Sequence, residues 1–170
     1  MVKLFPHQSE ALKSVKDLNR VAFYHDWGMG LGKTYTGGEK LVQLGTRVNL
    51  VICQKSKISD WVEHFNSNYK LYTYNLTKKE EFERFITASD LGYKHIIGVI
   101  NYELAFRRPE LAQLKDFTLM LDESSLIQNE QAKRSKFILK KLKPANVILL
   151  SGTPTGGKYE NLWSQMRLLG

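Results

Sequence analysis

The sequence has few cysteines and prolines and no long apolar run, and each shortage excludes a class of protein. The single cysteine, Cys53, cannot form a disulfide framework or a zinc ribbon, and it fits a reducing, cytoplasmic environment. Four prolines and no Pro-, Gly- or Ser-rich tract leave nothing that marks a domain boundary. Since no apolar run approaches the roughly 18 residues of a membrane span, we expect neither a membrane span nor a membrane partner.

Acidic residues are also in the minority. The 170-residue chain has 17 Asp and Glu against 25 Lys and Arg, which gives a formal net charge of +8 at pH 7. Hydrophobic residues make up 42% and aromatic residues 11% of the chain, which is enough for one globular core and excludes a disordered chain. The positive surplus hints at a polyanionic partner, although many basic proteins are merely soluble.

Short apolar runs alternate with helical patterns along the chain. Several runs are continuous, such as residues 119–121 and 147–150, which is typical of parallel strands covered on both faces. This alternation predicts an α/β fold with a mainly parallel central sheet flanked by helices, in which ligands bind at the carboxyl ends of the strands. The predicted strands are Val21–His25, Val48–Cys53, Lys70–Tyr74, His95–Ile100, Thr118–Asp122 and Val147–Ser151.

Between and after the strands, large apolar residues recur at helical spacing. Core packing is the interpretation that we favour for all of these stripes. The stripes consist of Ile58, Trp61, Val62 and Phe65; of Phe82, Phe85 and Ile86; and of Tyr159, Leu162, Trp163, Met166 and Leu169.

A glycine-rich segment follows the first predicted strand and leads into a helical pattern. Such a turn lets backbone N–H groups converge on phosphate oxygens, with a lysine for the β- and γ-phosphates and a hydroxyl for Mg²⁺. Trp27 stands where the strict pattern G-x-x-x-x-G-K-[ST] has glycine, so the match is to the looser G-x-G-K-T. The predicted nucleotide-binding residues here are Gly30, Leu31, Gly32, Lys33 and Thr34, with Thr34 also a magnesium ligand.

Two further motifs stand at strand ends. Asp122 and Glu123 close an apolar strand, where Asp122 could hold Mg²⁺ and Glu123 could polarise an attacking water. An ordinary acidic loop is the alternative. Residues 151–154, Ser-Gly-Thr-Pro, follow the last strand and could bond carboxylates or phosphates, although Gly and Pro also mark simple turns.

In their order along the chain, these motifs resemble those of superfamily-two helicases, and more narrowly of Swi/Snf-type ATPases that translocate on duplex DNA. The resemblance implies a RecA-like P-loop NTPase fold, a three-layer sandwich in which residues 1–170 form one ATP-binding lobe. It also implies a second RecA-like lobe, in the same longer chain or in another, whose arginines complete the ATP site. The motifs are Pro6-His7-Gln8, Gly28–Thr34, Cys53…Ser56…Trp61…Phe65, Asn101-Tyr102-Glu103-Leu104, Asp122-Glu123 and Ser151-Gly152-Thr153-Pro154.

The resemblance implies roles for individual residues around the nucleotide. Gln8 matches the glutamine that reads the adenine edge, and Lys33 and Thr34 match the phosphate and magnesium residues. Asp122 and Glu123 match the catalytic acidic pair, with Asp122 on Mg²⁺. The implied cofactors are therefore ATP and Mg²⁺, with Lys33 and Glu123 as the catalytic side chains.

Other residues are assigned to DNA by the same resemblance. Ser151 and Thr153 match the motif that couples hydrolysis to movement, and residues 53–59 and 100–103 match segments that touch the DNA backbone. The sequence departs from the family at Ser125, where a histidine is usual, and at Gln54, where proline is common. The predicted DNA contacts are Lys55, Lys57, Asn101 and Tyr102.

Basic residues also cluster after the acidic pair, on a predicted helix. A solvated helix face is the interpretation that we favour for this cluster, whereas Arg107 and Arg108, like Lys55 and Lys57, favour phosphate contact. The four histidines lack metal-binding spacing and are expected to be structural. The cluster consists of Lys133, Arg134, Lys136, Lys140, Lys141 and Lys143.

The sequence therefore predicts the ATP-hydrolysing lobe of a translocase on duplex DNA. Two alternatives stay open: the lobe of a strand-separating helicase, and a non-catalytic module that docks nucleic acid or a protein partner. Ser125 favours the module, and so does the lack of motifs for a second lobe. The intact Gly-Lys-Thr and Asp-Glu motifs oppose it.

Overall fold

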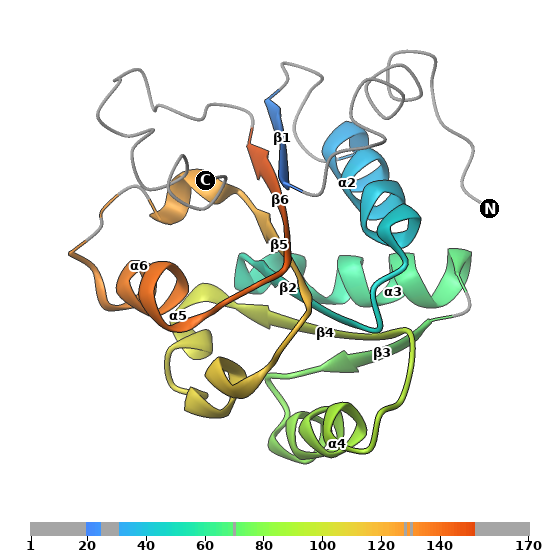
Figure 1. Cartoon of the computed structure of the whole chain (residues 1–170). Coiled ribbons are helices and arrows are strands. Elements are labelled where there is room, and N and C mark those ends of the chain that lie inside the picture. The colour runs from blue at the N-terminus through green and yellow to red at the C-terminus, as the bar shows by residue number, and fades with distance from the viewer. Residues whose placement is uncertain (1–19, 25–30, 70, 128, 130, 152–170) are drawn as a thin grey trace.

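A computed structural model describes residues 20–24, 31–69, 71–127, 129 and 131–151. Their strands form one six-stranded sheet in the order β1-β6-β5-β2-β4-β3, and every neighbouring pair is parallel (Figure 1). This is the predicted α/β architecture. The strands are β1 Arg20–Tyr24, β2 Val48–Cys53, β3 Tyr72–Asn75, β4 Ile96–Asn101, β5 Thr118–Asp122 and β6 Asn146–Ser151.

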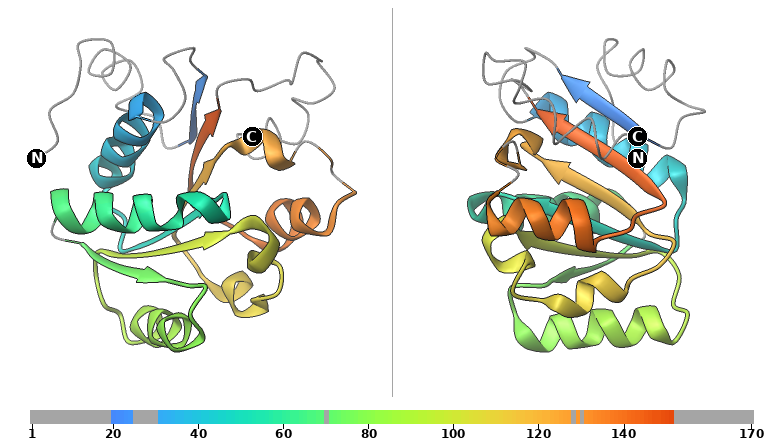
Figure 2. Two further views of the ribbon diagram at one scale, coloured as in Figure 1. Left: turned by 180° about the vertical axis from the view of Figure 1, so that it is seen from behind. Right: turned by 60° about the vertical axis from the view of Figure 1, so that its left-hand side comes forward.

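Helices cover both faces of the sheet and make the sandwich three layers thick (Figure 2). One face packs against α2 and α3, and the other packs against α4, α5 and the short helical segments between α5 and β6. No described helix has the length and apolar character needed to cross a membrane. The helical elements are α2 Leu31–Leu44, η1 Lys55–Lys57, α3 Ile58–Asn68, α4 Lys79–Asp90, α5 Tyr102–Ala105, η2 Pro109–Gln113, η3 Ser124–Ile127, α6 Lys133–Lys136 and the π-helical turn η4 Phe137–Lys141.

The continuous apolar character of the strands follows from burial on both faces. In β2 the side chains of Leu50 and Ile52 pack into the core under α4 and α5, whereas Val51 and Cys53 pack under α2 and α3. All six residues of β2 are buried. Adjacent residues of a strand point to opposite faces, so a strand between two helical layers has no solvent-facing position to fill with polar residues.

The predicted elements agree with the structure to within a few residues. β2 and β5 have the predicted bounds, and β4 begins at Ile96 because His95 adopts a left-handed backbone with φ 58°. The apolar stripes at 58–65 and 82–86 lie on α3 and α4. The third stripe, at 159–169, lies outside the described residues.

Two adjacent glycines let α2 approach its neighbours closely. A Cβ on Gly37 would lie 2.6 Å from Cδ1 of Leu150 in β6, and a Cβ on Gly38 would lie 2.9 Å from Nε2 of His64 in α3. Real Cβ atoms essentially never come this close to another heavy atom. The helix that follows the glycine-rich segment is therefore held tightly against both the sheet and α3.

Candidate active site

Strand register brings the ends of distant motifs to one edge of the sheet. Ser151 pairs with Tyr24, Asp122 pairs with Leu150, and Cys53 pairs with Asn101. These residues stand at the carboxyl ends of β1, β6, β5, β2 and β4. Because all the strands are parallel, residues far apart in sequence meet at the edge where α/β proteins bind ligands.

The start of α2 is the part of the glycine-rich segment that the structure describes. Gly32, Lys33 and Thr34 lie in the first turn of this 14-residue helix. No acidic side chain stands in that turn to neutralise the positive end of the helix dipole, so the turn favours an anion. Gly30, and likewise the predicted Gln8 and Thr153, fall outside the described residues.

Asp122, the first residue of the acidic pair, is 8% exposed at the end of β5. Its Oδ2 accepts a hydrogen bond of 2.9 Å from the indole Nε1–H of Trp61 in α3. Trp61 is itself 1% exposed and stacks on Phe65 with ring centroids 5.4 Å apart. The Asp122 carboxylate is thus oriented by a rigid, buried donor.

The backbone turns sharply at Glu123, the second residue of the pair, which has φ 58°. This left-handed conformation is uncommon outside glycine and persists where the surroundings enforce it. The hydroxyl of Tyr102 donates to the carbonyl oxygens of Asp122, at 2.8 Å, and Glu123, at 3.3 Å. The Glu123 carbonyl also accepts the backbone N–H of Leu126 at 3.0 Å. These bonds fix the direction in which the chain leaves β5.

Two nearby groups are held in their neutral forms. Burial, together with the nearby Asp122 carboxylate, raises the pKa of Tyr102 well above its ordinary value, so its hydroxyl remains a donor. Burial is also the main reason that the pKa of Cys53 is raised, with smaller effects from Asp122 and Asp60. Cys53 therefore stays a thiol, which suits a core residue and not a nucleophile.

The four predicted DNA contacts lie near this edge but differ in exposure. Lys55 and Lys57, in η1 directly after β2, are exposed, and Asn101 is half-buried at the end of β4. Tyr102 is only 3% exposed, and its hydroxyl is used within the lobe. The geometry therefore offers Lys55 and Lys57 to a DNA backbone and gives no support to a contact through Tyr102.

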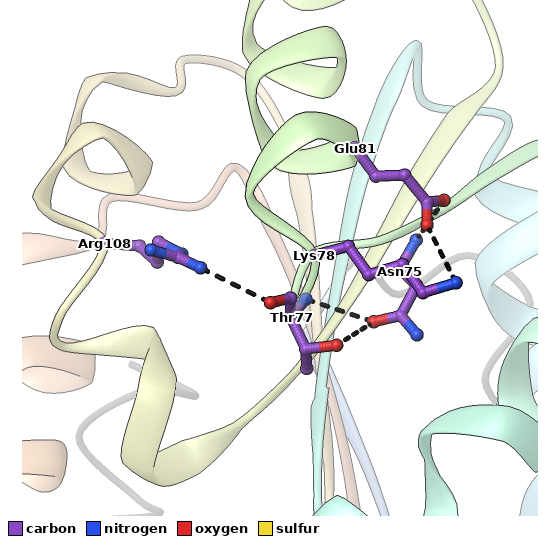
Figure 3. A network of polar contacts seen from close by, with 5 residues as sticks. All are labelled: Asn75, Thr77, Lys78, Glu81 and Arg108. Atoms are coloured by element: carbon purple, nitrogen blue, oxygen red, sulfur yellow. Dashed lines mark hydrogen bonds and ion pairs between the residues drawn. The ribbon is translucent and has the colours of Figure 1, made fainter.

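Arg108 is bound within the lobe (Figure 3). Its Nη2 donates to the carbonyl of Thr77 at 3.5 Å, and its guanidinium lies over the ring of Phe82, 5.2 Å from the centroid. Thr77 in turn bonds to Asn75, whose backbone N–H donates to Glu81 at 3.1 Å. These contacts support a structural role for Arg108 in the β3–α4 turn, whereas Arg107 is exposed.

The basic cluster after the acidic pair contains one arginine with a defined position. Arg134 forms an ion pair with Glu103 and donates from Nε to the carbonyl of Leu126 at 3.1 Å. These bonds tie α6 to α5 and η3. The lysines of the cluster are exposed, as a solvated helix face requires, and they are Lys133, Lys136, Lys140, Lys141 and Lys143.

The residues at this edge fit a magnesium nucleotide. A carboxylate that is 8% exposed is costly unless hydrogen bonds and a cation compensate it, and Mg²⁺ in nucleotide sites takes one or two carboxylates besides phosphate oxygens. Asp122 would hold the metal, and a role for Thr34 beside it stays a prediction from the sequence. The start of α2 provides the backbone donors that phosphates need.

Two polar contacts of this site were not predicted from the sequence. Trp61 was assigned to core packing, and Tyr102 to a DNA-contacting segment. A buried indole N–H or phenol hydroxyl nearly always finds an acceptor, so the residue types did indicate a bond. The acceptor could not be known, since Trp61 and Asp122 are 61 positions apart in the chain.

Comparison with known proteins assigns a family. Residues 23–170 match the model described as the SNF2-related domain. The chain is 25% identical over 181 residues to the ISWI chromatin-remodeling complex ATPase ISW1 of Saccharomyces cerevisiae, covering 98% of this chain and 16% of that protein. It is 27% identical over 179 residues to the chromatin-remodeling ATPase INO80 of Kluyveromyces lactis. That match covers 91% of this chain and 12% of INO80.

A solved structure has the same fold. The Sulfolobus solfataricus SWI2/SNF2 ATPase core in complex with dsDNA matches with a TM-score of 0.79 and 27% identity, over 99% of this chain and 36% of that one. The chain thus spans about a third of that core and less than a fifth of ISW1 or INO80. The match confirms the predicted RecA-like, three-layer fold.

Proposed function

Because this chain belongs to the SNF2-related domain family, we propose that it is the ATP-binding lobe of an enzyme that couples ATP hydrolysis to translocation on duplex DNA. The observation that carries the proposal is the acidic pair at the carboxyl edge of the sheet, where Asp122 is buried and Glu123 is half-buried. The ends of β1, β2, β4 and β6 lie at the same edge. A docking module without catalysis has no need of a buried, hydrogen-bonded aspartate there.

In this proposal each side chain has one task. The first turn of α2 binds the phosphates, with Lys33 on the β- and γ-phosphates. Asp122 and Thr34 hold the magnesium ion, which when bound neutralises charge on the phosphate oxygens. Glu123 orients the attacking water and accepts its proton, and the left-handed backbone at Glu123 sets where its side chain leaves the chain.

The remaining parts of the enzyme are also proposals. A second RecA-like lobe, in the same polypeptide or in another, would supply arginines toward the γ-phosphate. Duplex DNA is supported as the partner because the S. solfataricus core was solved with dsDNA. Lys55 and Lys57 would bind its backbone, and Ser151 and Thr153 would couple hydrolysis to movement. A reducing intracellular compartment fits the single buried cysteine.

The first experiment tests nucleotide binding by the 170-residue chain. Titration with a fluorescent ATP analogue and Mg²⁺ should give saturable binding, and Lys33→Ala should weaken it about 10- to 100-fold, because a charge-assisted contact with the phosphates is lost. Lys79→Ala removes an exposed lysine from the first turn of α4 and should leave binding unchanged. Equal affinities for the parent protein and Lys33→Ala would contradict the assignment of the site.

A second experiment separates translocation from strand separation. The chain together with its second lobe should displace the third strand of a DNA triplex in an ATP-dependent manner while leaving a simple duplex paired. Unwinding of the duplex would instead identify a strand-separating helicase. ATP-independent binding of DNA without turnover would identify the non-catalytic module.

A further inference from the structure

We infer that Trp61 and Tyr102 are positioning residues of the hydrolytic site, Trp61 for the metal-binding carboxylate and Tyr102 for the catalytic glutamate. The inference rests on the proposed ATPase function. It assigns separate tasks to two aromatic side chains that the sequence places in the core and in a DNA-contacting segment.

Trp61 acts on the carboxylate of Asp122. Its Nε1–H lies 2.9 Å from Oδ2, and both residues are nearly inaccessible to water, with exposed fractions of 1% and 8%. A hydrogen bond to a charged acceptor is about twice as strong as one between neutral groups. The donor uses one of the roughly four lone-pair positions of a carboxylate, and the bond restricts the orientation of the Asp122 carboxylate.

The indole is held rigidly enough to do this. It stacks on Phe65 at 5.4 Å, meets the ring of His64 edge-on at 5.9 Å, and belongs to a helix that packs beneath the sheet. Second-shell donors of this kind change metal affinity or activity by about 10- to 100-fold when they are removed. Trp61 therefore controls how readily Asp122 binds Mg²⁺.

Tyr102 acts on the backbone and not on a carboxylate. Its hydroxyl bonds to the carbonyl oxygens of two successive residues, Asp122 and Glu123, and the second of these has the left-handed φ of 58°. A single buried hydroxyl thus bridges two successive carbonyl groups at the point where the chain changes direction after β5. Without this bond the turn would relax, and the Glu123 carboxylate would point in a different direction.

Both residues also connect other elements to the acidic pair. Trp61 lies on α3, about one turn after Lys57, and Tyr102 directly follows Asn101. Beside Tyr102, Glu103 pairs with Arg134, which bonds to the carbonyl of Leu126 beyond the acidic pair. A movement of either segment that is predicted to touch DNA would therefore be transmitted to the acidic pair. The hydrogen bond of Trp61 would carry it to Asp122, and those of Tyr102 would carry it to the backbone of Asp122 and Glu123.

The test for Trp61 is the magnesium dependence of nucleotide binding. Replacement of Trp61 by β-(3-benzothienyl)alanine keeps the bicyclic shape and removes only the N–H, and Trp61→Phe is a simpler second variant. In both we expect the half-saturating Mg²⁺ concentration for binding a fluorescent ATP analogue to rise about tenfold. Phe65→Leu, which alters the stacking but no donor, should lower stability without this rise.

The test for Tyr102 uses turnover by the chain together with its second lobe. Tyr102→Phe removes the hydroxyl and should lower kcat about tenfold, with KM for ATP and the Mg²⁺ requirement unchanged, because only the direction of Glu123 is affected. Tyr74→Phe is the matched control. Tyr74 is also buried, at 6% exposed, but packs against Phe85 far from the acidic pair, and its variant should keep the parental kcat.

The outcomes separate this inference from the proposed function. If the parent binds the nucleotide with Mg²⁺ and Lys33→Ala binds it about 10- to 100-fold more weakly, the proposed function holds. An unchanged Mg²⁺ requirement in both Trp61 variants, or an unchanged kcat in Tyr102→Phe, then overturns the positioning role alone. If the parent itself shows no magnesium-dependent nucleotide binding, the proposed function and this inference fail together.

Discussion

The polar groups at the two ends of the parallel strands differ in charge. At the carboxyl edge stand two carboxylates, Asp122 and Glu123, with a left-handed turn and donors that come from α3 and α5. At the amino edge stand neutral side chains that bond to one another. Thr118 donates to Thr46, and Asn146 donates to both of them at 3.0 and 3.1 Å.

A network of hydrogen bonds joins the strands at the amino edge. Asn49 adds bonds to the carbonyls of Thr46 and Ile96 at 3.0 and 3.1 Å, so four chain segments are joined by threonine and asparagine alone. Arg47 completes the edge by donating to the carbonyls of Ser89 and Tyr93 at 3.1 and 2.8 Å. These bonds join neighbouring strands and satisfy most of the polar atoms involved, although the buried Oδ1 of Asn49 has no hydrogen-bond partner among the described residues.

The carboxyl edge of this lobe is suited to chemistry, and the amino edge contributes to its stability. Hydrogen bonds among threonines and asparagines, with one arginine, join the amino edge, whereas the carboxyl edge concentrates negative charge that needs a cation. Mutations at the carboxyl edge should therefore change turnover and ligand binding. Mutations at the amino edge should change the free energy of unfolding.

The largest effect should come from Glu123→Gln. The amide keeps the shape of the side chain but cannot accept a proton, so kcat should fall by about 10²–10⁴-fold while nucleotide binding is retained. Steady-state turnover by the two-lobe enzyme measures kcat, and an equilibrium titration measures nucleotide affinity. If Glu123→Gln kept the parental kcat, the assignment of catalysis to the carboxyl edge would be wrong.

Thr118→Val should have the next largest effect, and on stability alone. The substitution is close in volume and removes the hydroxyl that bonds to Thr46 and Asn146, so the free energy of unfolding should fall by about 1–3 kcal/mol. Urea unfolding measures the loss. Thr87→Val, at an exposed position of α4, should stay within about 0.5 kcal/mol of the parent. A change in nucleotide affinity for Thr118→Val would contradict the comparison.

Neutralising lysines should have a smaller effect that differs between the edges. Lys55→Gln and Lys57→Gln each remove one exposed charge beside the carboxyl edge, and each should reduce the slope of log K against log salt for duplex DNA by about 0.9. Lys115→Gln removes an exposed charge just before β5, at the amino edge, and serves as the control. Equal salt slopes for all three variants would show that DNA does not bind preferentially beside the carboxyl edge.

The smallest effect should be a pH dependence carried by His64. Burial lowers the pKa of His64 below its ordinary 6.5, so the unfolded chain binds more protons than the folded chain as the pH falls through that value. This contribution to stability is complete above about pH 6.5 and is lost on acidification. The urea midpoint at about pH 5.5 should be lower than that at about pH 7.5.

His64→Gln should flatten this pH profile, whereas Thr118→Val should retain it, because the threonines and asparagines of the amino edge do not titrate. An identical profile in His64→Gln and the parent would assign the effect to another group. The comparison therefore links the pH response to the side of the lobe where α3 packs, with His64 5.9 Å from the ring of Trp61.

Much of the fold followed from local patterns. All six strands were predicted to within about two residues, because doubly covered strands are continuous apolar runs. The start of β4 was missed by one residue at His95, whose left-handed backbone depends on the path of the preceding loop. The Asp-Glu and Gly-Lys-Thr motifs were found because their chemistry requires fixed residues at fixed spacing.

The side-chain contacts of Arg108 and Trp61 could not be found in this way. Arg108 follows a predicted DNA segment, yet it donates a hydrogen bond to the carbonyl of Thr77 (Figure 3). Its guanidinium also lies over the ring of Phe82. Similarly, Trp61 fits an apolar stripe whether or not its N–H meets an acceptor. Periodicity states which face of a helix is buried, but it does not state which atom lies opposite.

The parallel α/β order and the residue types that a phosphate and a metal ion require can be read from the sequence, since they depend on local spacing and on the edge that parallel strands share. The bonds from Trp61 to the Asp122 carboxylate and from Tyr102 to the turn at Glu123 become visible only in the folded chain. A hydrogen bond needs its donor and acceptor to be about 3 Å apart and well aligned. For residues so far apart in the chain, that geometry exists only once the strands have paired and the helices have packed on them.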